Sequence, residues 1–265
     1  MNGKTGGCEQ VYCSQCVNKE ALDFDFTMAF QPIINCQSLT IFGYEALVRG
    51  LNNESAYSII SKVNDENRYL FDQLCRVKAI ALAAKLEVST MLSINFLPNA
   101  ISQPERCIRT TLAAAKEHNF PIERIIFEFT ETEKLEDNKH IQRVIEYYQQ
   151  LNFTTATDDF GSGYSGLNLL ADFQTDIIKL DMELIRNIQQ DKVRQVIVKN
   201  CLSMFADLNV TPLAEGIETL GEYHWLREAG VELMQGYLFA KPGFEYLPEV
   251  NFSDLVDTYE QSSSV

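Results

Sequence analysis

Short apolar segments alternate with helical patterns along almost the whole chain, and this alternation is the strongest constraint on its fold. The predicted strands are residues 24–34, 40–49, 91–96, 124–130, 154–158, 176–181, 210–215 and 231–237. Strands that alternate with helices indicate βα units around a parallel sheet, and eight of them predict a closed barrel. We expect residues 1–22 to form an arm, 23–250 the barrel and 251–265 a tail.

Helical spacing of apolar residues marks the segments between the strands. Two of these stripes are Leu70, Leu74, Val77 and Ala81, and Val193, Ile197, Cys201, Met204 and Leu208. Each stripe predicts a helix.

A polar residue marks the end of nearly every predicted strand. These residues are Glu45, Asn95, Glu128, Asp158, Asp159, Lys179, Glu215 and Gln235. One such residue alone is more often a satisfied polar group, but in a barrel these positions converge on the C-terminal mouth, where active sites lie. So many carboxylates in one mouth repel one another. Hard divalent cations such as Mg²⁺ or Mn²⁺, which prefer oxygen ligands, relieve that repulsion.

The stretch TTATDDFGSG, residues 154–163, is the centre of this pattern. β-branched residues favour a strand, and the glycines allow a tight loop where it ends. Side chains that follow each other in a strand point to opposite faces, but a turn at the tip lets Asp158 and Asp159 converge on one cation. The alternative for an isolated pair of aspartates is a solvated turn.

Charge and hydropathy exclude several classes of function. The formal net charge is −15 and the pI about 4.6, so nucleic-acid polymers and anionic membranes are not expected partners. No segment approaches about 18 consecutive apolar residues, and the first ten residues lack an apolar signal core. We therefore expect a soluble, cytoplasmic protein. Its three histidines have no metal-ligand spacing, which argues against a histidine-bound zinc.

Three of the seven cysteines, Cys8, Cys13 and Cys16, cluster in the polar arm as C-x4-C-x2-C. Three thiols are suited to zinc or to redox sensing, yet no second motif completes a site, so a disordered arm is the favoured alternative.

Several motifs together resemble the EAL-domain cyclic di-GMP phosphodiesterases. They are EAL itself at residues 45–47 in FGYEALVRG, with FQPI before it, followed by SINF, FEFTETE, TDDFGSGYSGL, IIKLD, AEGIET and QGYLFAKP. The likeness covers about residues 24 to 245, with the motifs in family order. It implies a modified TIM (β/α)₈ barrel, of the α/β class, whose first strand is antiparallel. It also implies hydrolysis of cyclic di-GMP to linear pGpG with two Mg²⁺ or Mn²⁺ ions. Ca²⁺ is larger and less demanding in geometry, so we expect it to occupy the site and to be inhibitory.

The resemblance also assigns roles to residues. The implied metal ligands are Glu45, Asn95, Glu128, Asp158, Asp159 and Glu215, with Asp158 as the bridge. Catalysis is assigned to Asp158, Glu215 and Lys179, the lysine orienting the attacking water. Substrate contacts are assigned to Gln31, Leu47, Arg49, Asp181 and Gln235. Glu131 and Glu218 are implied supports around the site, Glu131 bracing the loop after Asp159, close to the interface of the homodimer typical of the family.

Three alternatives to this function can be compared with the sequence. Gly161, Gly163 and Gly166 form G-x-G-x-x-G after a strand, as in dinucleotide-binding oxidoreductases, but Asp158 and Asp159 would then face a pyrophosphate with negative charge. A serine hydrolase with the nucleophile motif G-x-S-x-G is excluded, because Leu167 stands where the last glycine of the motif around Ser165 would be. The serious alternative is a catalytically inactive barrel that binds cyclic di-GMP or a protein partner and signals.

Overall fold

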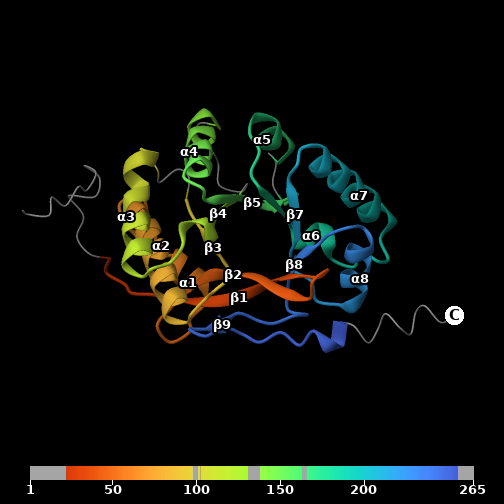
Figure 1. The fold of residues 1–265 in the computed structure, drawn as a ribbon, viewed down its shortest axis with the longest axis horizontal. Coiled ribbons are helices and arrows are strands. Elements are labelled where there is room, and N and C mark those ends of the chain that lie inside the picture. The colour runs from red at the N-terminus through yellow and green to blue at the C-terminus, as the bar shows by residue number, and fades with distance from the viewer. Residues whose placement is uncertain (1–21, 98–100, 102, 131–137, 163–165, 256–265) are drawn as a thin grey trace, which may run out of the picture.

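Eight strands form a closed barrel, as the alternation of strands and helices predicts. The computed structural model describes residues 22–97, 101, 103–130, 138–162 and 166–255 (Figure 1). The strands are β1 (Thr27–Asn35), β2 (Thr40–Arg49), β3 (Met91–Asn95), β4 (Ile125–Thr130), β5 (Thr154–Phe160), β6 (Ile177–Leu180), β7 (Thr211–Ala214), β8 (Leu233–Gln235) and β9 (Gly243–Phe244). The two-residue β9 was not predicted, because so short a strand shows no alternation.

The first strand runs against the others. Strands β2 to β8 are parallel neighbours in chain order, and β1 closes the barrel by pairing antiparallel with both β2 and β8. Thr27 pairs with Arg49, so β1 begins at the end of the barrel where β2 finishes. The predicted α/β barrel with an antiparallel first strand is therefore confirmed.

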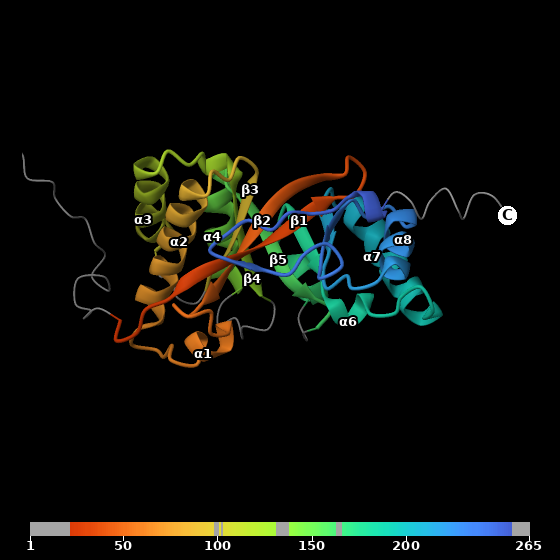
Figure 2. The same cartoon turned by 90° about the horizontal axis from the view of Figure 1, so that it is seen from below.

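The helices surround the barrel. They are α1 (Ala56–Ile60), α2 (Arg68–Lys85), α3 (Pro104–Glu117), the 3₁₀ helix η2 (Ile122–Arg124), α4 (Asn138–Gln150), α5 (Gly166–Asp172), α6 (Met182–Ile185), α7 (Lys192–Asp207) and α8 (Leu220–Glu228). In Figure 1, α2, α3 and α4 flank one side of the barrel and α5, α7 and α8 the other. The short helices α1 and α6 lie along one edge in Figure 2. No helix in the described part of the chain is long and apolar enough to cross a membrane.

The inside of the barrel has two layers. One is a cluster of buried apolar residues, one from each of six strands, which we call the apolar layer: Ile33, Ile126, Ala156, Ile177, Leu213 and Leu233. Side chains two apart in a strand share a face. Five of these residues are therefore followed, two positions on, by an inward polar residue, and we call that set the polar layer: Glu128, Asp158, Lys179, Glu215 and Gln235.

Helices α2 and α7 form where the two stripes predict helices, but their most deeply buried residues lie outside the stripes. The buried face of α2 includes Asp72, Cys75, Arg76, Ala79 and Ala83. On α7, Val198 and Phe205 are buried. The predicted α7 stripe is largely exposed, and its residue Val193 is 69% exposed. Periodicity finds an apolar face but does not reveal what covers it.

Some predictions fall outside the described residues. These concern the cysteines of the arm, Glu131 and Ser165.

Candidate active site

The strand register brings the predicted site residues to one end of the barrel. Asn95 pairs with Glu128 across β3 and β4, and Gln31 pairs with Glu45 across β1 and β2. Parallel strands end at the same edge of a sheet, and their inward side chains meet in the mouth.

Lys179 lies in the centre of the carboxylates. Its Nζ is 2.7 Å from Glu215, 2.8 Å from Glu128, 3.1 Å from Asp158 and 3.8 Å from Glu45. The lysine is 1% exposed. Burial opposes its charge, but the surrounding carboxylates outweigh this and raise the pKa of Lys179 well above its usual value. The ammonium group therefore remains charged.

Hydrogen bonds orient two of these carboxylates. Asn95 Nδ2 donates to Glu45 Oε1 at 2.9 Å, and Gln235 Nε2 donates to Glu45 Oε2 at 2.8 Å. The hydroxyl of buried Ser93 donates to Glu128 Oε1. Ser93 was not among the predicted site residues. The sequence did contain a signal for Ser93: it lies two positions before Asn95, so the two side chains share a face of β3.

Asp158 and Asp159 converge as predicted, and an irregularity in β5 is the reason. The pairing of β5 with β6 shifts register between Thr157 and Phe160, and Asp159 has a φ of 57°. Aspartate is among the few residues with a side chain that tolerate this left-handed conformation. As a result, oxygens of Asp158, Asp159 and Glu215 lie within 4.8 Å of one another.

The site is short of positive charge. Burial raises the pKa of Glu128 to about 8, against the opposing charge of Lys179. Burial and the charge of Asp158 raise the pKa of Asp159 to about 6. Burial also raises the pKa of Glu215 well above its usual range. In the described part of the chain, Lys179 is the only side chain that forms ion pairs with Glu45, Glu128, Asp158 or Glu215.

A pocket of about 420 Å³ opens over these groups. This volume is typical of a small-molecule site. Its lining is Gln31, Glu45, Asp159, Asp181, Met182, Glu215, Gly216, Glu218, Gln235, Gly236 and Tyr237. Gly236 is needed for close packing, because a Cβ there would lie 2.1 Å from the backbone oxygen of Ile217. The loops that follow β7 and β8 are thereby held together.

The remaining predicted residues have different surroundings. Asp181 lines the pocket and also caps α6, accepting a hydrogen bond from Glu183 N at 2.8 Å. Glu218 lines the pocket and pairs with Arg186 at 2.9 Å. Leu47 and Arg49 follow Glu45 on the same face of β2, but neither is among the pocket's lining residues, and Arg49 Nη1 donates to Val48 O at 2.7 Å.

Sequence reasoning missed part of the pocket lining. Met182 and Tyr237 line the pocket and are more than half exposed. Met182 directly follows the predicted residue Asp181, and Tyr237 lies two positions after the predicted residue Gln235. Their closeness in sequence to predicted site residues was a signal that they line the pocket. A single exposed apolar residue, however, belongs to no periodic pattern that would identify it.

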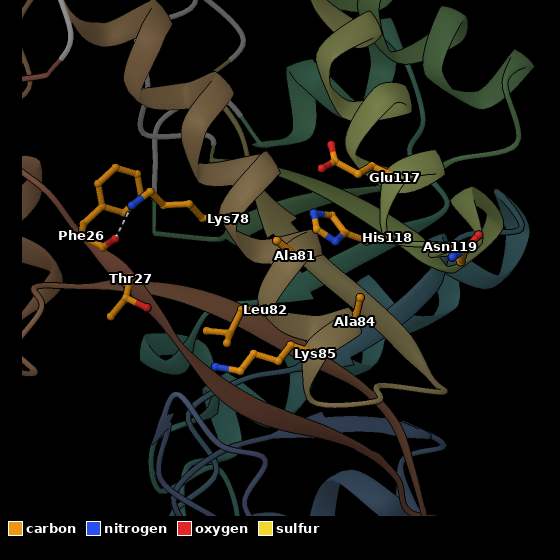
Figure 3. Close-up of a pocket in the computed structure, with 10 residues that line it drawn as sticks. All are labelled: Phe26, Thr27, Lys78, Ala81, Leu82, Ala84, Lys85, Glu117, His118 and Asn119. Atoms are coloured by element: carbon orange, nitrogen blue, oxygen red, sulfur yellow. Dashed lines mark hydrogen bonds between the residues drawn. The ribbon is translucent and has the colours of Figure 1, made fainter.

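A second, larger hollow lies outside the barrel. It has a volume of about 660 Å³ and is lined by residues of β1, α2 and the end of α3 (Figure 3). Lys78 on its wall donates to Phe26 O at 2.8 Å and pairs with Asp25. Its lining contains a single carboxylate, Glu117, so it lacks the ligand chemistry of the mouth.

The mouth fits divalent cations. Its potential ligands are carboxylate and amide oxygens, which suit Mg²⁺ and Mn²⁺, and three of the carboxylates already approach one another closely. The five carboxylates Glu45, Glu128, Asp158, Asp159 and Glu215, when ionised, leave four negative charges after Lys179 is counted. Two divalent cations would supply the four positive charges that balance them.

Comparisons with known proteins identify the family of this chain. The EAL domain model matches residues 18–242. A standalone versatile EAL protein from Vibrio cholerae O395, solved with c-di-GMP bound, is 73% identical, with a TM-score of 0.85 over 87% of this chain and 98% of that one. Klebsiella pneumoniae BlrP1, solved with manganese and cy-diGMP, is 32% identical, with a TM-score of 0.80 over 88% of this chain and 59% of that one.

Two relatives from Escherichia coli K12 are longer. The blue light- and temperature-regulated antirepressor BluF is 32% identical over 84% of this chain and 55% of its own length. The probable cyclic di-GMP phosphodiesterase PdeN is 28% identical over 82% of this chain and 43% of its own length. The chain thus spans about half the length of each. With most of its length matched by the family model, the chain belongs to the EAL domain family.

Proposed function

We propose that this protein is a metal-dependent phosphodiesterase that hydrolyses cyclic di-GMP to linear pGpG. The observation that carries the proposal is the arrangement of Lys179 among four carboxylates, with Asp159 beside Asp158 at the edge of the pocket. Such a cluster is costly for the fold, and it is suited to binding cations next to a phosphate.

The proposed cation ligands are those implied by the sequence: Glu45, Asn95, Glu128, Asp158, Asp159 and Glu215. When bound, divalent cations lower the pKa of water and offset the charge that develops on the phosphate. Asp158 is the best candidate to serve two ions, because it lies between Lys179 and Asp159.

The chain's own residues bind and orient the reactants. Lys179, held charged by its neighbours, orients the attacking water and stabilises negative charge in the transition state. The water oxygen adds to phosphorus and the bond from phosphorus to the 3′ oxygen breaks, which leaves a 5′-phosphate and a 3′-hydroxyl. Gln31, Leu47, Arg49, Asp181 and Gln235 are the proposed substrate contacts.

One specific observation favours a non-catalytic alternative. The relative BluF is named as an antirepressor, so a protein with an EAL domain can be named for regulation rather than hydrolysis. Against this alternative, every ligand implied by the family motifs is present in this chain.

The decisive experiment measures pGpG release by the wild type and by Asp158→Asn in EDTA, Ca²⁺, Mg²⁺ and Mn²⁺. We expect turnover with Mg²⁺ or Mn²⁺, little with Ca²⁺ and none in EDTA. Asp158→Asn preserves the shape but removes a charge, so turnover should fall by roughly a thousandfold. Activity that persists in EDTA, or normal turnover by the variant, contradicts the proposal. Binding of cyclic di-GMP without any turnover supports the regulatory alternative.

The bounds of the catalytic unit, the location of the protein and its oligomeric state are part of the same proposal. We propose that residues 23–250 are the catalytic unit, flanked by an arm and a tail, and that the protein acts in the cytoplasm as a homodimer. Analytical ultracentrifugation at several concentrations tests the dimer, and a monomer at every concentration contradicts it.

A further inference from the structure

Helix α2 carries an ion pair that is shut away from water. Arg76 Nη2 lies 2.5 Å from Asp72 Oδ2, and the two residues are 0% and 2% exposed. The guanidinium also donates to Thr111 Oγ1 on α3 at 3.3 Å and lies 5.9 Å from the ring centre of Phe127. Burying two charges is expensive, and an apolar pair of similar volume often packs as well or better. Helix packing alone therefore does not explain the pair.

The other oxygen of Asp72 contacts the chain that leaves the candidate active site. Oδ1 accepts a hydrogen bond of 2.9 Å from the backbone N–H of Leu97. The N–H of Phe96 donates to Glu128 O at 2.9 Å, which is the last bond of this segment to β4. The next N–H along the chain, that of Leu97, donates to Asp72 instead of to β4. A carboxylate accepts a stronger hydrogen bond than a neutral group does.

Leu97 lies two residues beyond Asn95, a proposed cation ligand that ends β3. The side chain of Asn95 is oriented by Glu45, at 2.9 Å on the inside of the barrel. Its backbone is fixed from the outside by the segment of Phe96 and Leu97. Phe96 packs edge-on against Phe127, the same ring that Arg76 approaches. The ion pair thus contacts the outer side of the two strands that carry Asn95 and Glu128.

We propose that Asp72, held in place by Arg76, is a positioning residue that sets the end of β3 and thereby the orientation of Asn95 in the mouth. The role in cation binding rests on the proposed function. The guanidinium neutralises Asp72 and fixes the plane of its carboxylate, so that Oδ1 faces Leu97. Outer hydrogen bonds of this kind affect metal sites through the ligands that they orient.

Two double variants separate positioning from helix stability. Asp72→Asn with Arg76→Met removes both charges but keeps an oxygen that accepts from Leu97. Asp72→Leu with Arg76→Met removes both charges and the acceptor. Neither leaves an unpaired buried charge, so both should fold. A third variant, Val198→Ala, lowers stability from a buried position on α7, a helix that carries none of the proposed site residues.

The measurements are Mn²⁺ affinity, the NMR signal of the Asn95 side-chain amide in the metal-free protein, and the separate values of kcat and KM. In the leucine double variant we expect about tenfold weaker Mn²⁺ binding, a shifted Asn95 signal and about tenfold lower kcat with little change in KM. The asparagine double variant should rescue most of each effect, because it keeps the acceptor for Leu97 but lacks the guanidinium that fixes the plane of that group. Val198→Ala should change melting temperature alone.

Equal Mn²⁺ affinity and an identical Asn95 signal in the two double variants would overturn the proposal. These readouts do not require turnover. If the wild type fails to hydrolyse cyclic di-GMP, the proposed function fails while Mn²⁺ affinity and the Asn95 signal still decide the positioning role. If the wild type binds no Mn²⁺, the Asn95 signal alone decides it.

Discussion

The apolar layer and the polar layer of the barrel are built on the same strands, two residues apart. In the apolar layer, Leu213 and its neighbours are buried against one another and stabilise the fold by removing surface from water. In the polar layer, Glu215, two positions later, is half-buried among like charges and has a raised pKa. One period of side-chain alternation therefore separates residues that stabilise the barrel from residues that destabilise it and that we propose to carry its chemistry.

Substitution of Lys179 tests the polar layer most severely. Lys179→Met retains the volume but removes the positive charge among four carboxylates, so turnover should fall by roughly a hundredfold to a thousandfold. In EDTA the free energy of unfolding should also fall, by about 3 kcal/mol, because a buried charge partner is lost. Mn²⁺ should recover part of that stability. Urea titrations with and without Mn²⁺, beside turnover assays, measure both effects. Full turnover in the variant would remove Lys179 from the mechanism.

Substitution in the apolar layer should have the opposite profile. Leu213→Ala removes a side chain that is 1% exposed, and we expect a loss of about 3 kcal/mol in the free energy of unfolding. Turnover per folded molecule should remain within a few-fold of the wild type. Urea unfolding followed by fluorescence, with kinetics under conditions where the variant is folded, makes the comparison. A loss of turnover like that of Lys179→Met would show that the two layers are not separable.

Glu222 provides a smaller, pH-dependent effect at the start of α8, outside both layers. Its carboxylate accepts from the backbone N–H groups of Asn187, Glu218 and Thr219, and with Thr219 it forms a capping box at the start of α8. Burial alone would raise the pKa of Glu222, but these hydrogen bonds outweigh it and lower the pKa. We expect Glu222→Gln to cost about 1 kcal/mol at pH 7.

The sign of the pH dependence follows from that lowered pKa. A carboxyl with a lower pKa in the folded state stabilises the protein above its unfolded pKa of about 4.3, and this stabilisation is lost as the pH falls through the folded value. The difference in unfolding free energy between the wild type and Glu222→Gln should therefore shrink below about pH 4. A difference that stays constant from pH 7 to pH 3 would contradict this.

Deletion of residues 1–20 should have the smallest effect. The predicted site residues all lie beyond this arm, so turnover should stay within a few-fold of the full chain. Steady-state kinetics of the two proteins, matched for folded fraction by circular dichroism, provide the measurement. A large loss in a well-folded deletion would mean that the arm belongs to the catalytic unit.

The sequence predicts the barrel well because its strands are short, apolar and regularly spaced. It also predicts the convergence of Asp158 and Asp159, since two adjacent carboxylates before a glycine are typical of a turn at a strand end. The antiparallel first strand follows only from the family motifs, since alternation carries no strand direction.

The parts that were missed depend on contacts between distant segments. Asp72 and Arg76 interrupt an otherwise apolar helix face, and their burial depends on Thr111 and Leu97, 35 and 25 residues away along the chain. Ser93 is an ordinary small polar residue until its register with Glu128 is known. The exposed stripe of α7 has the same periodicity as a buried one.

The reversed first strand has a consequence for how this barrel can be connected to other modules. In a barrel of eight parallel strands, the chain enters at the end opposite the reaction. Here Thr27 pairs with Arg49, so the chain enters at the end where the carboxylates gather. Any module joined ahead of β1 is therefore attached on the side of the candidate active site. Gln31, four residues after Thr27 on β1, pairs with Glu45, so the attachment point and a proposed cation ligand are linked through one short stretch of strand.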